Sequence, residues 1–268
     1  MKTLLAATGL AMLLVAPASA QVTASVGADY TSGQYGTGQR VRSASSTASL
    51  RAKHKRVTVF AALPYVQVDA PGNVVAPGGP LGLPILVDPT RPATRVKRSG
   101  LGDAVVGASV QLVPPRRHHL ALALTGSAKL PTASASQGLG TGKADYSVVA
   151  EAAVPGKVTP FAAIGHSFVG QPDAYALRDV TSARGGVALG IGKASEVSVS
   201  YNYASRVSDQ VADRQEIGAG LDTALSQRLS LGVQGSAGVS KGAPDGGAAG
   251  TAALILSGTG RIQASPCR

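Results

Sequence analysis

The chain has 268 residues, a formal net charge of +11, one cysteine, no tryptophan and 34 glycines. Because Cys267 has no second cysteine to pair with, a disulfide-stapled secreted domain is excluded. The basic charge alone is compatible with nucleic-acid binding, but neither clustered aromatic residues nor a recognisable binding module accompanies it. We therefore expect contact with anionic lipid or lipopolysaccharide phosphates instead.

Residues 1–20 have the composition of a signal peptide. Lys2 precedes an apolar run over residues 4–15, and Pro17-Ala18-Ser19-Ala20 resembles a cleavage site. The run is about a dozen residues long, whereas a membrane-spanning helix needs roughly twenty. The sequence predicts export and cleavage before Gln21.

The rest of the chain alternates apolar and polar residues with a period of two, which is typical of strands. The pattern is clearest over residues 195–203, 228–240 and 119–130, where Val, Leu and Tyr alternate with polar residues. Nine further segments are weaker: 22–32, 42–52, 56–69, 101–112, 145–154, 158–169, 183–192, 214–223 and 247–257. The prediction is an all-β fold with about twelve antiparallel strands.

The predicted connections alternate between long and short. The long ones cover residues 33–41, 70–100, 131–144, 170–182, 205–213 and 240–246, and the short ones 53–55, 113–118, 155–157, 193–194 and 224–227. A soluble β-sandwich also has alternating strands, but it has no reason to sort its loops by length. Long extracellular loops and short periplasmic turns are typical of transmembrane β-barrels. We predict a barrel over residues 21–258 and a periplasmic tail over 259–268.

The connection over residues 70–100 is too long for a simple hairpin and is rich in proline. It either folds into the barrel as a constriction or covers it as a cap. Its basic residues are candidates for anion or lipopolysaccharide contact, with a solvated charge run as the alternative: Arg91, Arg95, Lys97 and Arg98.

Charged residues on the polar faces of the predicted strands are candidates for the lumen. They are Asp29, Arg51, Asp103, Lys129, Glu151, Arg184, Glu196, Glu216 and Asp222. Their mixed signs fit either a water-filled pore or a plug of salt bridges, and both alternatives remain open. About twelve strands favours a narrow channel.

The histidines give no support for catalysis or metal binding. His54, His118 and His119 lie in or beside predicted basic turns, and adjacent strand positions place His166 and Ser167 on opposite faces. Because no nucleophile has a recognisable base and no ligand spacing is present, we expect no catalytic residue, no metal and no cofactor.

Three short motifs, two of them glycine-rich, resemble a known family. They are Gly100-Leu101-Gly102-Asp103, Lys129-Leu130-Pro131-Thr132, and Gly138-Leu139-Gly140-Thr141-Gly142 with Asp145. Together they resemble the outer-membrane transporters grouped as the MetA-pathway of phenol degradation family. The resemblance covers about residues 100–170 and implies a barrel that passes small, hydrophobic or aromatic compounds across the outer membrane.

We therefore expect a passive channel in the bacterial outer membrane. The alternative is a non-conducting barrel that acts as an envelope scaffold or adhesin. The expected partners are outer-membrane lipid, lipopolysaccharide, small solutes and the barrel-assembly machinery, with no nucleic acid. Aromatic residues make up only 4% of the chain, so only a sparse interfacial girdle is expected, from Tyr30, Tyr65, Tyr146, Phe161, Phe168, Tyr201 and Tyr203.

Overall fold

The computed structural model describes residues 20–75, 85–173 and 175–257. The predicted signal peptide, apart from Ala20, and the predicted tail with Cys267 lie outside these residues. The described residues contain no helix long and apolar enough to span a membrane.

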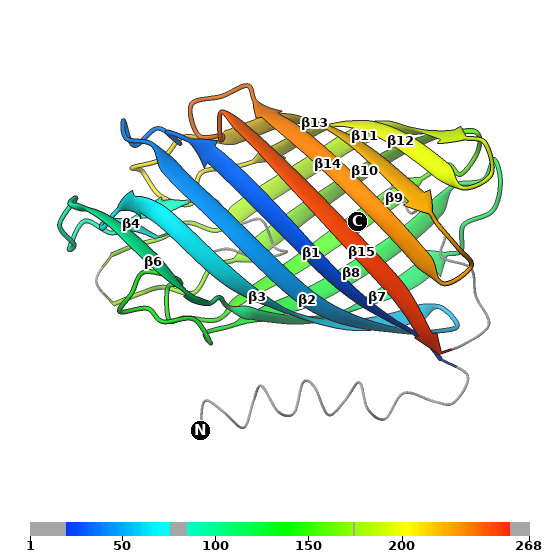
Figure 1. Ribbon diagram of the computed structural model, residues 1–268, viewed down its shortest axis with the longest axis horizontal. Helices are drawn as coiled ribbons and strands as arrows, with labels where there is room; N and C mark the ends of the chain where they lie inside the picture. The colour runs from blue at the N-terminus through cyan, green and yellow to red at the C-terminus, as the bar shows by residue number, and fades with distance from the viewer. Residues whose placement is uncertain (1–19, 76–84, 174, 258–268) are drawn as a thin grey trace.

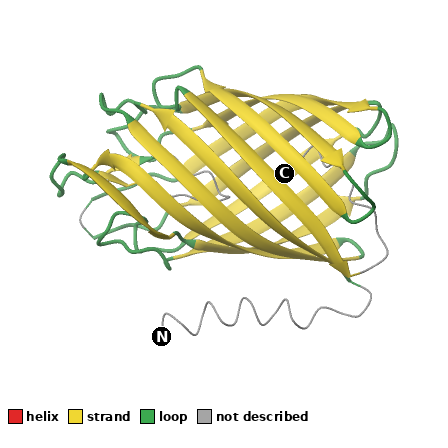
Figure 2. Ribbon diagram, viewed as in Figure 1, coloured by secondary structure: helices red, strands yellow, loops and turns green. Residues whose placement is uncertain are grey.

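The described chain consists of strands joined by loops and turns (Figure 2). The strands are β1 (Gln21–Gly33), β2 (Val41–His54), β3 (Val57–Pro71), β4 (Val74–Val75), β5 (Leu86–Val87), β6 (Arg95–Leu101), β7 (Ala104–Val113), β8 (Ala121–Leu130), β9 (Asp145–Ala153), β10 (Val158–Phe168), β11 (Val180–Ile191), β12 (Ser195–Ala204), β13 (Arg214–Ala224), β14 (Leu229–Gly238) and β15 (Gly246–Ser257).

All strands except β4 and β5 form one antiparallel sheet that closes into a barrel (Figure 1). Closure comes from β1, which pairs with both β2 and β15, and from the additional pairing of β2 with β3. Strands β6 and β7 pair with successive parts of β3, so they share one position and the barrel has 12 strands around its wall. A closed sheet has no open edge, so its backbone groups are satisfied within lipid. The prediction of about twelve strands is confirmed.

Apolar side chains point out of the barrel. Val26, Ile164, Val199 and Val233 are each about 60% exposed, at 62%, 61%, 59% and 60%. Their sequence neighbours point inward and are mostly small or polar, since successive side chains of a strand alternate between the faces. The apolar exterior and polar interior are those of a membrane barrel.

The outward aromatic residues lie in the half of the wall next to the long loops. Tyr30, Tyr65, Tyr146, Phe168 and Tyr201 are all exposed on that surface. Phe161 departs from the expected girdle because its side chain points inward and is only 5% exposed. The girdle is therefore sparse and is confined to one interface.

The long loops and the short turns lie at opposite ends, as predicted. The extracellular loops used below are L1 (34–40), L2 (72–94), L3 (131–144), L4 (169–179) and L5 (205–213), and the periplasmic turns are T1 (55–56), T2 (114–120), T3 (154–157), T4 (192–194) and T5 (225–228). The predicted loop 70–100 is too long, because residues 95–101 form β6 on the end of β3. This strand was not expected from the sequence, because three of the four side chains in Arg95-Val96-Lys97-Arg98 are basic.

Candidate functional site

Eight of the nine candidate lumen residues lie in strands, on the face opposite the exposed apolar side chains, and Asp103 lies between β6 and β7. Glu196 lies directly opposite Asp222, and Asn202 opposite Glu216, while the residues that alternate with them, such as Val199 and Ile217, are exposed on the outer face. Asp29 faces Ser45 across β1 and β2, and the Ser45 hydroxyl donates to its carboxylate. The alternation of a strand is thus sufficient to assign these side chains to the interior.

The interior contains a cavity of about 430 Å³. Charged residues of both signs line it, together with serine, asparagine, glutamine and glycine. The charged residues are Asp29, Glu151, Arg184, Arg214 and Glu216. Arg184 and Arg51 both place positive charge near Glu151, and Arg214 pairs with Glu216. The lumen wall is therefore polar, with its charges balanced locally.

Two inward phenylalanines lie over glycines of neighbouring strands. Phe60 of β3 lies opposite Gly107, and Phe161 of β10 lies opposite Gly186. A Cβ added to Gly186 would lie only 2.6 Å from Cζ of Phe161, so the ring occupies the space that a side chain would need. The Arg184 guanidinium lies 5.2 Å from the centroid of the Phe161 ring, which is a cation–π distance. Neither ring was expected in the interior, although the alternation of residues along β3 and β10 is the signal that places both on the inward face.

The family-like motifs meet in a buried ion cluster beneath L3. The Lys129 Nζ lies 3.2 Å from Asp103 Oδ2 and 2.8 Å from Asp145 Oδ2, and all three side chains are at most 4% exposed. Asp103 also accepts the amide of Ala133 in L3, and Asp145 accepts the amide of Gly170 in L4. Asp103 and Lys129 lie on the inward side, but L3 encloses them and they do not line the open lumen. Their geometry is that of a clamp for the loops.

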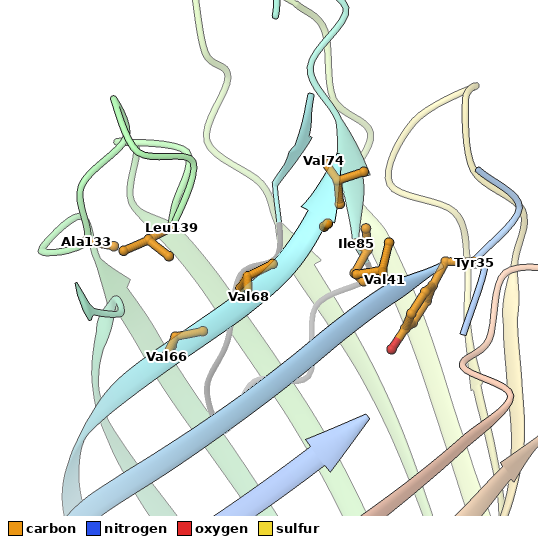
Figure 3. Close-up of a cluster of buried hydrophobic side chains, with 9 residues drawn as sticks. Tyr35, Val41, Val66, Val68, Val74, Ile85, Ala133 and Leu139 are labelled. Carbon is orange, nitrogen blue, oxygen red and sulfur yellow. The ribbon is translucent and has the colours of Figure 1, made fainter. Parts of the chain in front are cut away.

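Residues 72–75 and 85–94 of L2 are described, and within them β4 pairs with β5 at the extracellular mouth. One face of this hairpin packs on the wall formed by β2 and β3 (Figure 3). That hydrophobic cluster, which we call the β3 cluster, consists of Tyr35, Val41, Val66, Val68, Ala70, Val74, Ile85, Ala133 and Leu139. It joins L1, L2 and L3 to the inside of the wall. Burial raises the pKa of Tyr35, so its hydroxyl stays neutral.

The other side of the hairpin packs on the far wall. This second cluster, the β11 cluster, consists of Val75, Leu86, Val169, Leu177, Val180, Val207 and Val211. Its wall residues come from L4, β11 and L5, which lie across the barrel from β3 in the strand order. L2 is therefore a bridge over the mouth, and of the two predicted alternatives it is closer to the inward-folded constriction.

Polar contacts hold the base of the bridge. Arg91 Nε lies 2.9 Å from Asp88 Oδ2, and its Nη1 donates to the Ser136 carbonyl of L3 at 3.1 Å. Arg98 points inward and donates to the carbonyls of Gly72 and Val74. Burial disfavours the ionised form of Asp88, but hydrogen bonds from the Thr90 hydroxyl and amide and the Arg91 guanidinium outweigh it, so the pKa lies below 3.8.

The four basic residues predicted for this loop are thus separated by the structure. Arg91 and Arg98 fasten L2 from within. Arg95 and Lys97 lie on β6 with their side chains on the outer face, where Lys97 stands opposite Asp69 and Arg95 Nε pairs with Asp69 Oδ1 at 2.8 Å. The period of two along β6 is the signal that separates the inward Arg98 from the outward Arg95 and Lys97.

The histidines occupy unrelated positions. His118 and His119 are exposed in T2, and His54 ends β2. His166 lies on the outer face beside Phe168, whereas Ser167 points inward and bonds to Ser147. No group of three or more metal-ligating side chains was found among the described residues.

Residues 25–255 match the family model described as "Putative MetA-pathway of phenol degradation". The chain belongs to this family. The match extends well beyond residues 100–170, where the phenol-degradation family motifs stand. The ion cluster of Asp103, Lys129 and Asp145 gives those motifs a shared structural role. No curated protein shows significant sequence similarity to the chain.

Solved structures with the same fold are outer-membrane barrels. An outer membrane channel from Pseudomonas putida F1 is similar with a TM-score of 0.67 and 12% identity, over 90% of this chain and 97% of that chain. The NanC porin has a TM-score of 0.53 and 8% identity, over 87% and 98% of the two chains. The transport unit of the autotransporter AIDA-I from Escherichia coli has a TM-score of 0.50 and 10% identity, over 90% and 91%. This member of the phenol-degradation family thus has the fold of an outer-membrane β-barrel.

Proposed function

We propose that the protein is a passive outer-membrane channel for small hydrophobic or aromatic solutes, with L2 controlling access from outside. The observation that carries this proposal is the contrast between an apolar mouth and a polar lumen. Val74 and Val75 are each 1% exposed in clusters at the mouth, and below them the wall is lined by polar side chains. A solute that loosens the bridge meets apolar surface first and a hydrated passage next.

The dimensions of the interior support a solute of one aromatic ring. An apolar cavity of about 150 Å³ is enough to bind benzene, and the lumen cavity measures about 430 Å³. The description of the family, which refers to phenol degradation, agrees with an aromatic solute. Such passage requires no catalytic step, and we propose no enzymatic activity.

Conductance in planar bilayers tests the proposal. We expect the folded protein to carry a small ion current, and we expect phenol, but not arabinose at the same concentration, to interrupt it by occupying the mouth. Arabinose is the control for a general effect of added solute. Absence of both ion current and solute flux from correctly folded protein would favour the non-conducting scaffold or adhesin. A current that responds equally to phenol and arabinose would indicate a channel with no preference for aromatic solutes.

A further inference from the structure

Exposed cations surround the periplasmic end of the barrel. Each of the five turns carries at least one, and Lys53 adds another at the end of β2. The full set, which we call the basic rim, is Lys53, Lys55, Arg56, Arg116, Arg117, Lys157, Lys193 and Arg228, and all of its members are exposed.

The basic rim lacks acidic partners. Turns T1 to T5 contain no aspartate or glutamate, and the nearest carboxylates along the chain, Glu151, Glu196 and Asp222, lie on the inward register. The ion pairs found among the described residues include none of the rim side chains. The rim therefore carries an uncompensated positive potential.

The extracellular end shows the opposite arrangement. Several exposed cations in and beside its loops are paired with carboxylates, as in Arg40–Asp245, Lys143–Asp173 and Arg178–Asp209. The strong positive charge of the chain is thus distributed unevenly. Carboxylates offset much of it at the extracellular end, whereas the exposed cations of the periplasmic turns have no such carboxylates beside them.

The backbone fixes the positions of the rim cations. The carbonyl of Arg56 accepts the amide of Gln111, that of Lys157 accepts the amide of Gly190, and that of Arg228 accepts the amide of Ile255. His118 of T2 donates its amide to Pro155 of T3, so neighbouring turns are joined as well. Because the backbone is already ordered, a long side chain on a fixed Cα can bring its charged group to a nearby anion without further loss of backbone conformational entropy.

Apolar residues on the outer face stand directly beside the rim. Val57 follows Arg56, Leu120 ends T2 and Val158 follows Lys157, with exposures of 45%, 51% and 55%. Leu225, at 56%, begins the turn that ends with Arg228. Each cation therefore lies where the apolar band of the wall meets water, which is the depth of the lipid phosphates.

From this arrangement we propose that the basic rim is a binding site for the headgroup phosphates of anionic phospholipids, such as phosphatidylglycerol, in the inner leaflet. Two features favour lipid over an acidic protein. The cations are spread over all five turns and do not form one patch, and each adjoins lipid-facing apolar surface. The inference does not depend on channel activity, because a closed barrel would bind the same headgroups.

Native mass spectrometry of barrels released from nanodiscs tests the inference. The discs contain equimolar phosphatidylglycerol and phosphatidylcholine, so lipid retained by the barrel reports its charge preference. The test variant combines Arg56→Gln, Lys157→Gln and Arg228→Gln. The control variant combines Arg42→Gln, Lys143→Gln and Arg178→Gln, which removes the same charge from exposed, ion-paired extracellular positions.

We expect the unchanged protein and the control to retain phosphatidylglycerol preferentially. Loss of one cation beside an anionic headgroup weakens that site about five-fold, so the test variant should lose most of this preference. High salt should also abolish the preference in the unchanged protein, which checks the result without any substitution. Equal retention by the two variants, a preference that persists at high salt, or binding of soluble polyglutamate without phosphatidylglycerol preference would each overturn the inference.

Discussion

Val74 and Val75 are adjacent in the chain, yet their side chains lie in the β3 cluster and the β11 cluster, on opposite walls of the barrel. The pair stands in β4, where successive side chains point in opposite directions. Full burial of a valine contributes about 1.5 kcal/mol, so these two side chains and their partners hold a loop that has only two paired residues on each strand of its hairpin.

The first prediction concerns this bridge. Val75→Asp places a carboxylate in the β11 cluster, which contains no cation that could pair with it. Burial of an unpaired charge costs several kcal/mol. We expect L2 to leave the far wall and the single-channel conductance to rise at least two-fold. Gln39→Asp adds the same charge to the exposed surface of L1 and should leave conductance unchanged. Unchanged conductance in the Val75 variant would show that L2 does not limit the current.

The second prediction concerns the ion cluster beneath L3. Lys129→Met leaves the buried carboxylates of Asp103 and Asp145 without their cation, which typically costs about 3 to 5 kcal/mol. Urea unfolding of the barrel in lipid vesicles should show this loss. Lys143→Gln, which removes one partner of an exposed pair, should cost less than about 1 kcal/mol.

A companion to that variant separates charge from packing. Adding Asp103→Asn and Asp145→Asn to Lys129→Met removes the unpaired charges, so we expect much of the lost stability to return. Because asparagine can still accept the amides of Ala133 and Gly170, failure of the triple variant to recover would show that unpaired charge does not cause the loss in Lys129→Met.

The third prediction is a pH dependence of the bridge. The pKa of Asp88 is lower in the folded protein than its usual value of 3.8, so its ionised form stabilises L2 above that pH. This contribution is lost as the pH falls through the folded pKa, and we expect the current to become larger or noisier below about pH 4. Asp88→Asn should show the loosened behaviour at pH 7 and lose this part of the pH response. Asp173→Asn, at an exposed pair in L4, is the control.

The fourth prediction concerns the glycine beneath Phe161. In Gly186→Ala, the new Cβ would collide with the carbonyl oxygen of Val199 and with the Phe161 ring. Overpacking of this kind costs about 1 to 3 kcal/mol. Gly126→Ala, whose Cβ would meet nothing within 4 Å, should change the free energy of unfolding by less than about 0.5 kcal/mol. Equal changes in the free energy of unfolding for the two variants would show that the cost comes from replacing any strand glycine, and not from the collision with Phe161 and Val199.

Much of the architecture could be predicted from the sequence because its causes are local. Alternation along a strand assigns each side chain to one face, so Glu151, Glu196 and Asp222 could be placed inside from their neighbours alone. Loop lengths can also be read locally, and the difference between long loops and short turns indicates which end of the barrel is extracellular. The error at β6 arose because polar and basic residues can also follow a strand where it passes beyond the membrane, and there the alternation of hydrophobicity fades.

The sequence by itself determined a closed membrane barrel with a polar interior and an apolar exterior, since the period of a strand and the preference of lipid for apolar side chains act residue by residue. Only the tertiary structure decided where L2 lies, which of Arg91, Arg95, Lys97 and Arg98 point inward, and that Asp103, Lys129 and Asp145 form one cluster. These features depend on contacts between residues far apart in the chain. Such contacts leave no periodic signal, because they arise only when the barrel brings distant loops to the same mouth.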